Sequence, residues 1–476
     1  MTQGNRQSSL YRVIWRWHFY AGLFIIPMVL ILSVTGAMYL FKPQVERWEE
    51  RAFQKLPTAD TVAPSIQRDA ALAAYPGSKF LYYRLPERTG DAALVHLRVR
   101  GEGQVLRDVF VSPQGKVLGA LDPDRRIMEI ARDIHGQLML GHRGSWLVEL
   151  AASWAIVLMV SGLYLWCPKG TGLSGVFWPR FGLGRRILLR DLHAVTGFWV
   201  AGFALVLLLT GLPWAEVWGS GFKAIRTEMG WIKGEQDWTI GGRAVAGEHA
   251  MHMNGASTMQ QGRAREPFPP RSLYATNHPA STAVGLDLVV ARAETENLVF
   301  PVIVAPPEGS DSPWTTRSDS QNRPLRVTLR YDPRNGRELS RETFDDKHVI
   351  DRVVGYGVAW HEGQLFGLAN QLIGTLTAVA LITLSVTGFL SWRRRKPEGR
   401  LGAPPPLPAR LDGIGIRLVA AVLLLGLPMF TISAAILWLL DRFVLPHLPV
   451  LARWLGVREA WKCQDPSSPP HSEALK

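Results

Sequence analysis

Four histidines occupy equivalent positions in two parts of the sequence. His18 opens the segment His-Phe-Tyr-Ala-Gly, and Thr-Gly follows 17 residues later; His193 opens His-Ala-Val-Thr-Gly, and Thr-Gly follows at the same spacing. His135 and His361 form the second equivalent pair, each followed at matching spacings by Gly, by Ser-Gly or Thr-Gly, and by Trp. Imidazole binds haem iron axially, and two facing helices can supply one ligand each. The four positions predict sites for two haems of the b type.

A single histidine at a helix end would not support this interpretation. Such a side chain usually reaches interfacial water, and the ordinary interpretation is a solvated or hydrogen-bonded polar residue. Because four histidines recur at equivalent places in the two parts of the sequence, we favour the interpretation that they are haem ligands. Glycines in the same segments would allow close helix packing or leave room for a flat macrocycle. They are Gly22, Gly36, Gly197, Gly202 and Gly211.

Three arginines near the histidines could pair with haem propionates, because guanidinium groups bind carboxylates in bidentate geometry. They are Arg16, Arg143 and Arg190. For Arg16 and Arg190, anchoring at the membrane surface is the plainer interpretation.

His142 is an alternative ligand to His135. It follows seven residues later, which on a continuous helix is the same face. The second part of the sequence has Leu368 at the equivalent position. The repeat therefore favours His135 and leaves His142 as a substitute ligand or a group that faces a substrate.

A separate cluster of His and Met residues lies farther along the chain. It contains His249, Met251, His252 and Met253. This combination suits copper, especially Cu(I). A plain polar loop is the competing interpretation, because Met is often used only for packing.

Five apolar segments have the roughly 20 residues that a membrane-spanning helix needs. They lie at about 18–41, 146–166, 187–214, 368–392 and 414–440. The 18 Trp among 476 residues also suit a membrane protein, where indoles collect at the interface. The first segment is too long for the apolar part of a signal peptide, so we expect it to be retained.

The basic residues predict the orientation of these helices. Residues 1–17, 168–190 and 392–413 together hold 14 basic and two acidic residues, which accounts for nearly all of the net charge of +13. Such short basic segments stay in the cytoplasm. We therefore expect a cytoplasmic N-terminus and long connections outside, which in a bacterium is the periplasm. The basic charge is a topology signal and predicts no nucleic-acid partner.

The sequence predicts a mainly α-helical integral membrane protein in which two repeated two-helix units are followed by a fifth helix. Each external connection carries a predicted hairpin, with turns at Gly115 and Gly336, so two small α+β lobes are expected. Residues 301–324, rich in Pro, Ser and Asp, are expected to form a loop. The predicted divisions are 1–41 (N-terminus and first helix), 42–140 (first lobe), 141–214 (second and third helices with a basic loop), 215–363 (second lobe), 364–392 (fourth helix), 393–413 (basic linker), 414–440 (fifth helix) and 441–476 (periplasmic tail).

Cysteine content excludes several classes of protein. The chain has two cysteines, Cys167 and Cys463. A disulfide scaffold, a zinc ribbon and a cysteine-ligated iron–sulfur cluster all need more. The motif Cys-x-x-Cys-His is absent, which excludes covalent c-type haem.

These segments resemble the PepSY-associated transmembrane-helix family of bacterial membrane proteins, which includes iron-regulated uptake proteins and haem-containing siderophore reductases. The resemblance covers about residues 10–396. It is closest from His361 to Trp392 and from His135 to Trp166, and both hairpins resemble the PepSY lobe. It implies a bacterial inner membrane, haem b, and reduction of Fe³⁺ held by a chelator outside. The matching positions for haem ligands are His18, His193, His135 and His361.

The leading hypothesis is a haem reductase that passes electrons across the bilayer to a periplasmic ferric chelate, such as a siderophore. No flavin or nicotinamide domain is visible, so electrons would come from a cytoplasmic partner or a quinol. One alternative is a haem relay to another acceptor, either copper or a partner protein. Another is a haem-free PepSY protein whose lobes bind or regulate other proteins.

Overall fold

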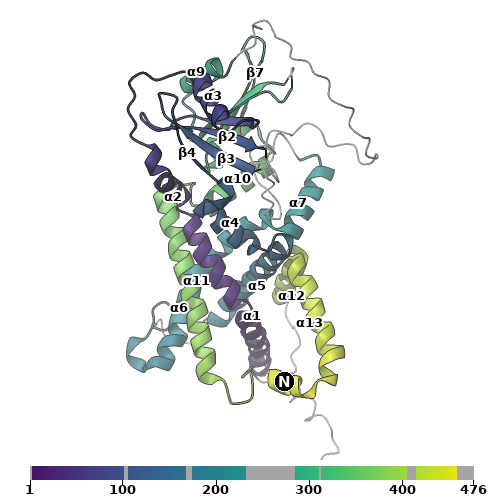
Figure 1. Cartoon of the computed structure of the whole chain (residues 1–476). Helices are drawn as coiled ribbons and strands as arrows, with labels where there is room; N and C mark the ends of the chain where they lie inside the picture. The colour runs from purple at the N-terminus through teal and green to yellow at the C-terminus, as the bar shows by residue number, and fades with distance from the viewer. Residues whose placement is uncertain are drawn as a thin grey trace, which may run out of the picture.

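The computed structural model describes residues 3–100, 105–167, 174–231, 285–309, 312–404 and 414–457. A long helical bundle carries a β-sheet domain at one end (Figure 1). We call this the sheet end, and the opposite end, where the first helix begins, the distal end.

Four helices form the centre of the bundle. They are α1 (Gln3–Tyr39), α5 (His142–Trp166), α6 (Arg185–Gly211) and α11 (Leu368–Arg395). Helix α1 packs against α5 and α11, and α6 packs against the same two helices. Helices α1 and α6 run from the distal end to the sheet end, while α5 and α11 run back (Figure 1). This antiparallel arrangement places residues of α1 and α6 beside residues of α5 and α11 at both ends.

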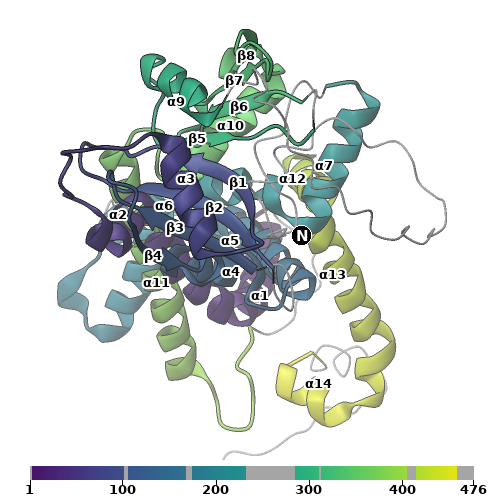
Figure 2. The same ribbon diagram turned by 45° about the horizontal axis from the view of Figure 1, so that its top comes forward.

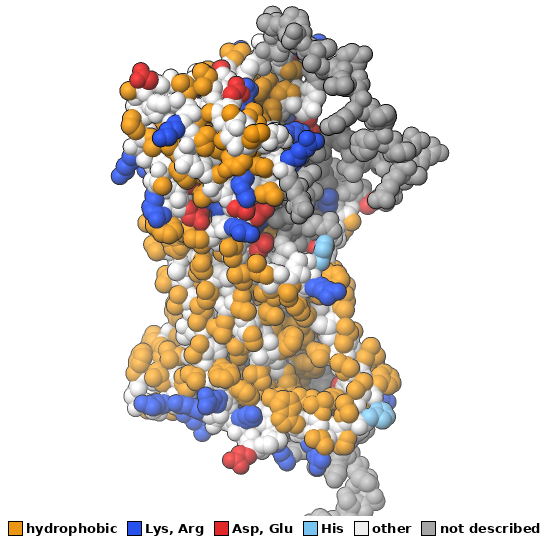
Figure 3. Space-filling model, viewed as in Figure 1, with side chains coloured by type: hydrophobic (Ala, Val, Ile, Leu, Met, Phe, Trp, Pro, Cys, Tyr) orange, Lys and Arg blue, Asp and Glu red, His pale blue; other side chains and the backbone are white. Residues whose placement is uncertain are grey.

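Five helices among the described residues are long and apolar enough to cross a membrane. Their candidate spans are Leu10–Tyr39, His142–Trp166, Arg185–Trp214, Leu368–Arg395 and Pro428–His447. Hydrophobic side chains cover much of the helical part on the face in Figure 3, with Lys and Arg gathered at the distal end. These features indicate a multi-pass membrane protein.

One antiparallel sheet of eight strands stands above the bundle. Its order is β4-β3-β2-β1-β5-β6-β7-β8. The strands are β1 (Lys79–Arg84), β2 (Ala93–Val99), β3 (Val105–Val111), β4 (Val117–Leu121), β5 (Val302–Ala305), β6 (Trp314–Ser318), β7 (Val327–Tyr331) and β8 (Glu338–Thr343). The sequence predicted two separate lobes, but β1 pairs with β5, with Tyr83 opposite Val304. The strands of the two long connections, before α5 and before α11, therefore share one sheet.

Both predicted hairpins are present as β3–β4 and β7–β8. Their turns contain Gly115 and Gly336 at positive φ, which glycine adopts without steric cost. The predicted loop over 301–324 is wrong in part, because β5 and β6 lie within it. All four residues of β5 are buried, so this short apolar run forms a strand despite its polar flanks.

Helices cover the far face of the sheet, away from the bundle. They are α3 (Pro64–Ala74) and α9 (Leu286–Thr295), which lie over the strands in Figure 2. Their apolar residues join a core with Val95, Val109 and Val304. The opposite face of the same strands buries Leu94, Phe110 and Ile303. Burial on both faces explains why these strands read as apolar runs rather than as strict alternations.

Two short helices connect the sheet to the bundle. These are α4 (Ile127–Gln137), which precedes α5, and α10 (Val349–His361), which precedes α11. Each is followed by a tight turn in which a glycine, Gly141 or Gly367, takes positive φ. Helices α2 (Lys42–Glu49) and α7 (Glu216–Glu228) follow α1 and α6 at the sheet end.

The segment predicted as one fifth helix over 414–440 folds differently. Helix α12 (Ile414–Gly426) ends before Pro428, and α13 (Pro428–Leu439) runs back toward the distal end (Figure 1). Proline lacks an amide hydrogen and disfavours helical geometry in the preceding residue, and Leu427 is accordingly non-helical, with φ −128° and ψ 83°. Thirteen residues of α12 span about 20 Å, less than the bilayer core.

The end of the described chain lies at the distal end, not beside the sheet. Helix α14 (Pro449–Leu455) contacts the start of α1, where the Tyr20 hydroxyl donates to the Leu455 carbonyl at 2.5 Å. The Arg16 guanidinium donates to the Gly456 carbonyl at 3.0 Å. The described part of the predicted periplasmic tail therefore lies on the same side as the N-terminus.

Candidate functional site

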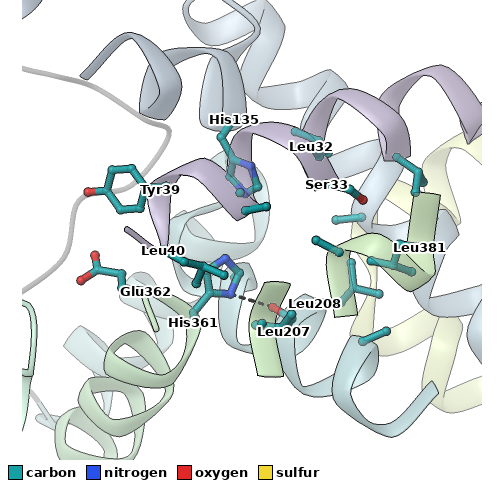
Figure 4. A pocket seen from close by; sticks show the side chains of 18 of the residues that line it. Leu32, Ser33, Tyr39, Leu40, His135, Leu207, Leu208, His361, Glu362 and Leu381 are labelled. Atoms are coloured by element: carbon teal, nitrogen blue, oxygen red, sulfur yellow. Dashed lines mark hydrogen bonds between the residues drawn. The ribbon is translucent and has the colours of Figure 1, made fainter. Parts of the chain in front are cut away.

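The structure brings the four predicted histidines together as two facing pairs. At the distal end, the ring centres of His18 on α1 and His193 on α6 are 6.4 Å apart, with planes 89° apart. At the sheet end, those of His135 and His361, in the last turns of α4 and α10, are 6.3 Å apart, with planes 70° apart. The latter two rings point toward each other in Figure 4. We call these the distal pair and the sheet-side pair.

The spacing within each pair suits one metal ion between two imidazoles. A ring centre lies about 1.2 Å from its nitrogen and a nitrogen–metal bond is about 2 Å long, so two trans imidazoles have centres about 6.4 Å apart. Both observed separations, 6.4 and 6.3 Å, agree with this value.

Main-chain carbonyls determine which ring nitrogen carries the proton. Nδ1 of His361 lies 2.9 Å from the Leu207 carbonyl oxygen, and Nδ1 of His193 lies 3.0 Å from that of Leu384. A carbonyl only accepts, so Nδ1 must be the donor, and in a neutral ring Nε2 then holds a free lone pair. Metal-binding histidines are typically oriented in this way, with the second nitrogen donating to a carbonyl.

The sheet-side pair is held in the neutral form. Burial lowers the pKa of His361 to about 4. Burial, reinforced by the neighbouring His361, lowers the pKa of His135 to about 4 as well. Because an imidazole must be deprotonated to bind a metal, both rings are competent as ligands at neutral pH.

A continuous cavity joins the two pairs. Its volume is about 2130 Å³, and it extends from the distal pair, between the four central helices, past the sheet-side pair to the underside of the sheet. Small-molecule pockets usually measure about 300–1,000 Å³, so this space exceeds one such ligand. Its middle is apolar, with Leu32, Leu208 and Leu381 on the walls (Figure 4). A flat apolar macrocycle at each histidine pair fits these walls.

Cationic side chains line the cavity near both pairs. At the sheet end they are Lys42, Arg47, Arg84, Arg126, Arg132, Arg323 and Arg326, and at the distal end Arg186, Arg190, Arg394 and Arg395. Groups of this kind bind carboxylates such as haem propionates. Only Arg190 of the three predicted arginines lines the cavity. It also donates to Asp191 at 2.9 Å.

The other two predicted arginines lie elsewhere. Arg16 donates to main-chain carbonyls of Pro404 and Gly456, which ties α1 to the following segments. Arg143 is exposed at the start of α5. Arg132 lines the cavity but was not among the predicted arginines, although it lies three residues before His135 and shares its helical face.

His142 lies outside the sheet-side pair. Helix α4 ends at Gln137 and α5 begins at His142, so a turn separates the two histidines and the inference of one shared helical face is wrong. The imidazole of His142 contacts Glu216, with Nδ1 3.1 Å from Oε1. The geometry therefore pairs His135, and not His142, with His361.

A buried polar cluster forms the roof of the cavity and was not anticipated from sequence. His96 Nδ1 and Asp108 Oδ1 lie 2.6 Å apart on adjacent strands. Arg126 contacts Glu50 at 2.9 Å and lies 3.9 Å from Asp108. Burial alone would raise the pKa of Asp108, but the hydrogen bond from His96 and the nearby Arg126 lower it overall. The cluster places paired charges above the sheet-side pair.

The predicted His-Met cluster at His249, Met251, His252 and Met253 lies outside the described residues. Within the described parts of the chain, no group of three or more His, Cys, Asp or Glu side chains is arranged to hold a metal ion. The paired histidines are therefore the strongest candidates there for binding a cofactor.

Comparison with known proteins agrees with this architecture. A search of curated proteins found no match. The family model PepSY_TM, described as the PepSY-associated TM region, matches residues 15–395. The match includes all four paired histidines and the sheet domain. The chain belongs to this family of PepSY-associated transmembrane proteins.

Proposed function

We propose that the protein is a transmembrane reductase that binds two haems b and transfers electrons outward across the membrane to a ferric chelate. The observation that carries this proposal is the presence of two opposed histidine pairs, each spaced for one metal ion, at the two ends of one four-helix bundle. Along α1, His18 and Gly36, which contacts His135, are separated by about 27 Å of helix. The two sites would lie near opposite membrane faces.

The histidines, the apolar side chains and the cationic side chains of the cavity would have different roles in such a reductase. His18 and His193 would hold the distal haem, and His135 and His361 the sheet-side haem; the bound groups would supply reversible one-electron chemistry. The apolar walls exclude water between the pairs. The cavity-lining cations would balance propionate charge at each end.

The direction of transfer rests on the charge distribution. Arg393, Arg394 and Arg395 end α11 at the distal end, which favours a cytoplasmic location for that end in the bacterial inner membrane. The sheet would then lie in the periplasm. Its paired buried charges roof the cavity where an external ferric chelate would approach. Reduction would release iron because oxygen chelators hold Fe²⁺ less tightly than Fe³⁺.

The electron donor would be a quinol or a cytoplasmic protein. A relay to copper or to a partner protein would use the same two haems and differ only at the sheet end. A haem-free PepSY protein that binds other proteins would use only the sheet domain.

An absorption spectrum of the purified protein, oxidised and dithionite-reduced, tests the proposal together with a pyridine haemochrome count. We expect a b-type spectrum with two haems per chain. The reduced protein should be reoxidised by a ferric chelate faster than by a matched redox-inert gallium chelate. A featureless visible spectrum from cells with adequate haem would overturn the proposal in favour of the haem-free alternative. Reoxidation only by copper or by a protein would overturn the chelate as acceptor.

A further inference from the structure

A five-residue segment recurs once in each of the four central helices. Its pattern is Leu, two variable residues, Ser or Thr, and Gly. The copies are Leu-Ser-Val-Thr-Gly at 32–36, Leu-Met-Val-Ser-Gly at 158–162, Leu-Leu-Leu-Thr-Gly at 207–211 and Leu-Ser-Val-Thr-Gly at 384–388. Each copy contacts a different one of the four paired histidines.

The hydroxyl of each copy lies next to Nδ1 of its histidine. The distances are 2.9 Å for Ser161 and His18, 3.1 Å for Thr35 and His135, 3.2 Å for Thr210 and His361, and 3.3 Å for Thr387 and His193. At each of the four histidines, one serine or threonine hydroxyl thus lies within hydrogen-bond distance of Nδ1.

Each hydroxyl already uses its own hydrogen within its helix. Thr210 donates to the Val206 carbonyl at 2.7 Å, and Thr35 donates to that of Ile31 at 2.8 Å. Thr387 and Ser161 likewise donate to carbonyls of their own helices. The hydroxyl oxygen can then only accept, so the histidine must donate from Nδ1. This assigns the same tautomer to the three rings beside a threonine, and the longer bond of Ser161 to the Leu158 carbonyl, at 3.3 Å, is compatible with it at His18.

The leucine of the pattern supplies a second acceptor. The carbonyls of Leu207 and Leu384 accept from His361 and His193, as described above. A threonine that bonds back to its own helix often bends the helix there, which is compatible with a carbonyl oxygen that also accepts from a neighbouring ring.

The glycine makes room for the edge of the ring. A Cβ built on Gly36 would lie 3.0 Å from Cε1 of His135, and one on Gly211 would lie 3.1 Å from Cε1 of His361. The corresponding distances are 3.3 Å both for Gly162 to His18 and for Gly388 to His193. Any larger residue would push the ring, most strongly in the sheet-side pair.

We propose that these four segments are positioning devices, each of which sets the tautomer and the rotation of one haem-ligating histidine. The inference rests on the proposed haem function and adds the residues that tune each ligand. Donation from Nδ1 makes the ligating nitrogen more basic, which favours Fe³⁺ and lowers the midpoint potential. The glycine allows the ring rotation that gives the two pairs their steep interplanar angles.

Thr210→Val and Gly211→Ala test the device at His361. Thr210→Val removes one acceptor and should raise the midpoint potential of one haem, while Thr210→Ser should restore it. Gly211→Ala should turn the ring, change the low-temperature electron paramagnetic resonance signal of that haem, and weaken haem retention by about 10- to 100-fold.

Matched controls lie on α6 and α11, two of the helices that carry these segments. Gly202, one of the glycines predicted to leave room for a macrocycle, is instead exposed on α6, and no atom lies within 4 Å of a Cβ built there. Thr383 on α11 is half-buried, and among the contacts described its hydroxyl bonds only its own helix. Gly202→Ala and Thr383→Val should leave both haem signals unchanged. Should Gly211→Ala fail to accumulate, Ser161→Ala, a smaller change, should still raise the potential of the distal haem.

The outcomes separate the two proposals. Absence of haem from the unmodified protein would refute the proposed function. Two haems in the unmodified protein, with potentials and resonance signals in Thr210→Val, Ser161→Ala and Gly211→Ala equal to those of the controls, would overturn the positioning role alone.

Discussion

His135 and His361 face each other at the sheet end of the bundle, with ring centres 6.3 Å apart and planes inclined by 70°. They come from α4 and α10, the two connecting helices that lead from the sheet into α5 and α11. The sheet is continuous through the pairing of β1 with β5. It therefore fixes the positions of the two connecting helices relative to each other. The position of this histidine pair thus depends on the sheet domain as well as on the membrane helices.

Replacing either member of the sheet-side pair should remove the same haem. We expect His135→Ala and His361→Ala each to bind one haem per chain instead of two, because one axial ligand is lost from the same site. His142→Ala should keep both, since its imidazole contacts Glu216. Pyridine haemochrome counts on the three purified variants measure this. Loss of haem in His142→Ala, with retention in His135→Ala, would reverse the assignment.

The ring planes of the distal pair predict a spectroscopic signature. His18 and His193 are inclined by 89°, and near-perpendicular axial imidazoles leave the iron d orbitals almost degenerate. The oxidised protein should therefore show strongly anisotropic low-spin signals in electron paramagnetic resonance. The distal haem can be assigned by its loss in His193→Ala. A well-resolved rhombic signal from that haem would show that the rings lie parallel when it is bound.

The buried His96–Asp108 pair, on adjacent strands of the sheet, should contribute stability that depends on pH. Asp108 has a pKa below its ordinary value, so its carboxylate stabilises the fold above the unfolded pKa of about 3.9, and this contribution is lost as the pH falls through the lower folded value. Asp108→Asn should cost about 3 kcal/mol at neutral pH because it leaves buried charges without their counter-charge. Thermal unfolding in detergent at pH 7 and near pH 3 would measure this. A gap between variant and parent that stays constant with pH would contradict the assignment.

The C-terminal helices predict where a thiol reagent can reach. Val450 on α14 is exposed and lies at the distal end, as does Cys167. In a Cys463→Ser background, both Cys167 and Val450→Cys should react with a membrane-impermeant maleimide only after the inner membrane is opened. Ser340→Cys on β8 should react in intact spheroplasts. Labelling of Val450→Cys without permeabilisation would place α14 with the sheet and contradict the hairpin.

Local features of the sequence were sufficient for several conclusions. Length and apolarity were enough to find four central membrane helices, because the bilayer imposes a minimum apolar length. Turn glycines located the hairpins, since positive φ is a local requirement. The motifs around the four paired histidines were enough to predict the family, which the family model confirms. Spacing also singled out the four histidines as a set.

Long-range packing decided the rest. The two predicted lobes form one sheet because β1 pairs with β5. No local sequence pattern predicts that pairing. The return of the chain at Leu427 depends on a proline whose effect on a long apolar run can be read as a kink or as a turn. The polar roof joins His96 and Arg126 from separate elements.

The sequence by itself determined that the chain crosses a membrane and carries a repeated set of histidines, because apolar length and residue spacing act within single helices. Only the tertiary structure decided which Ser/Thr-Gly segment faces which histidine, and that His135 rather than His142 lies opposite His361. Those relationships join helices that are distant in sequence, and they arise from the packing of four antiparallel helices under one sheet.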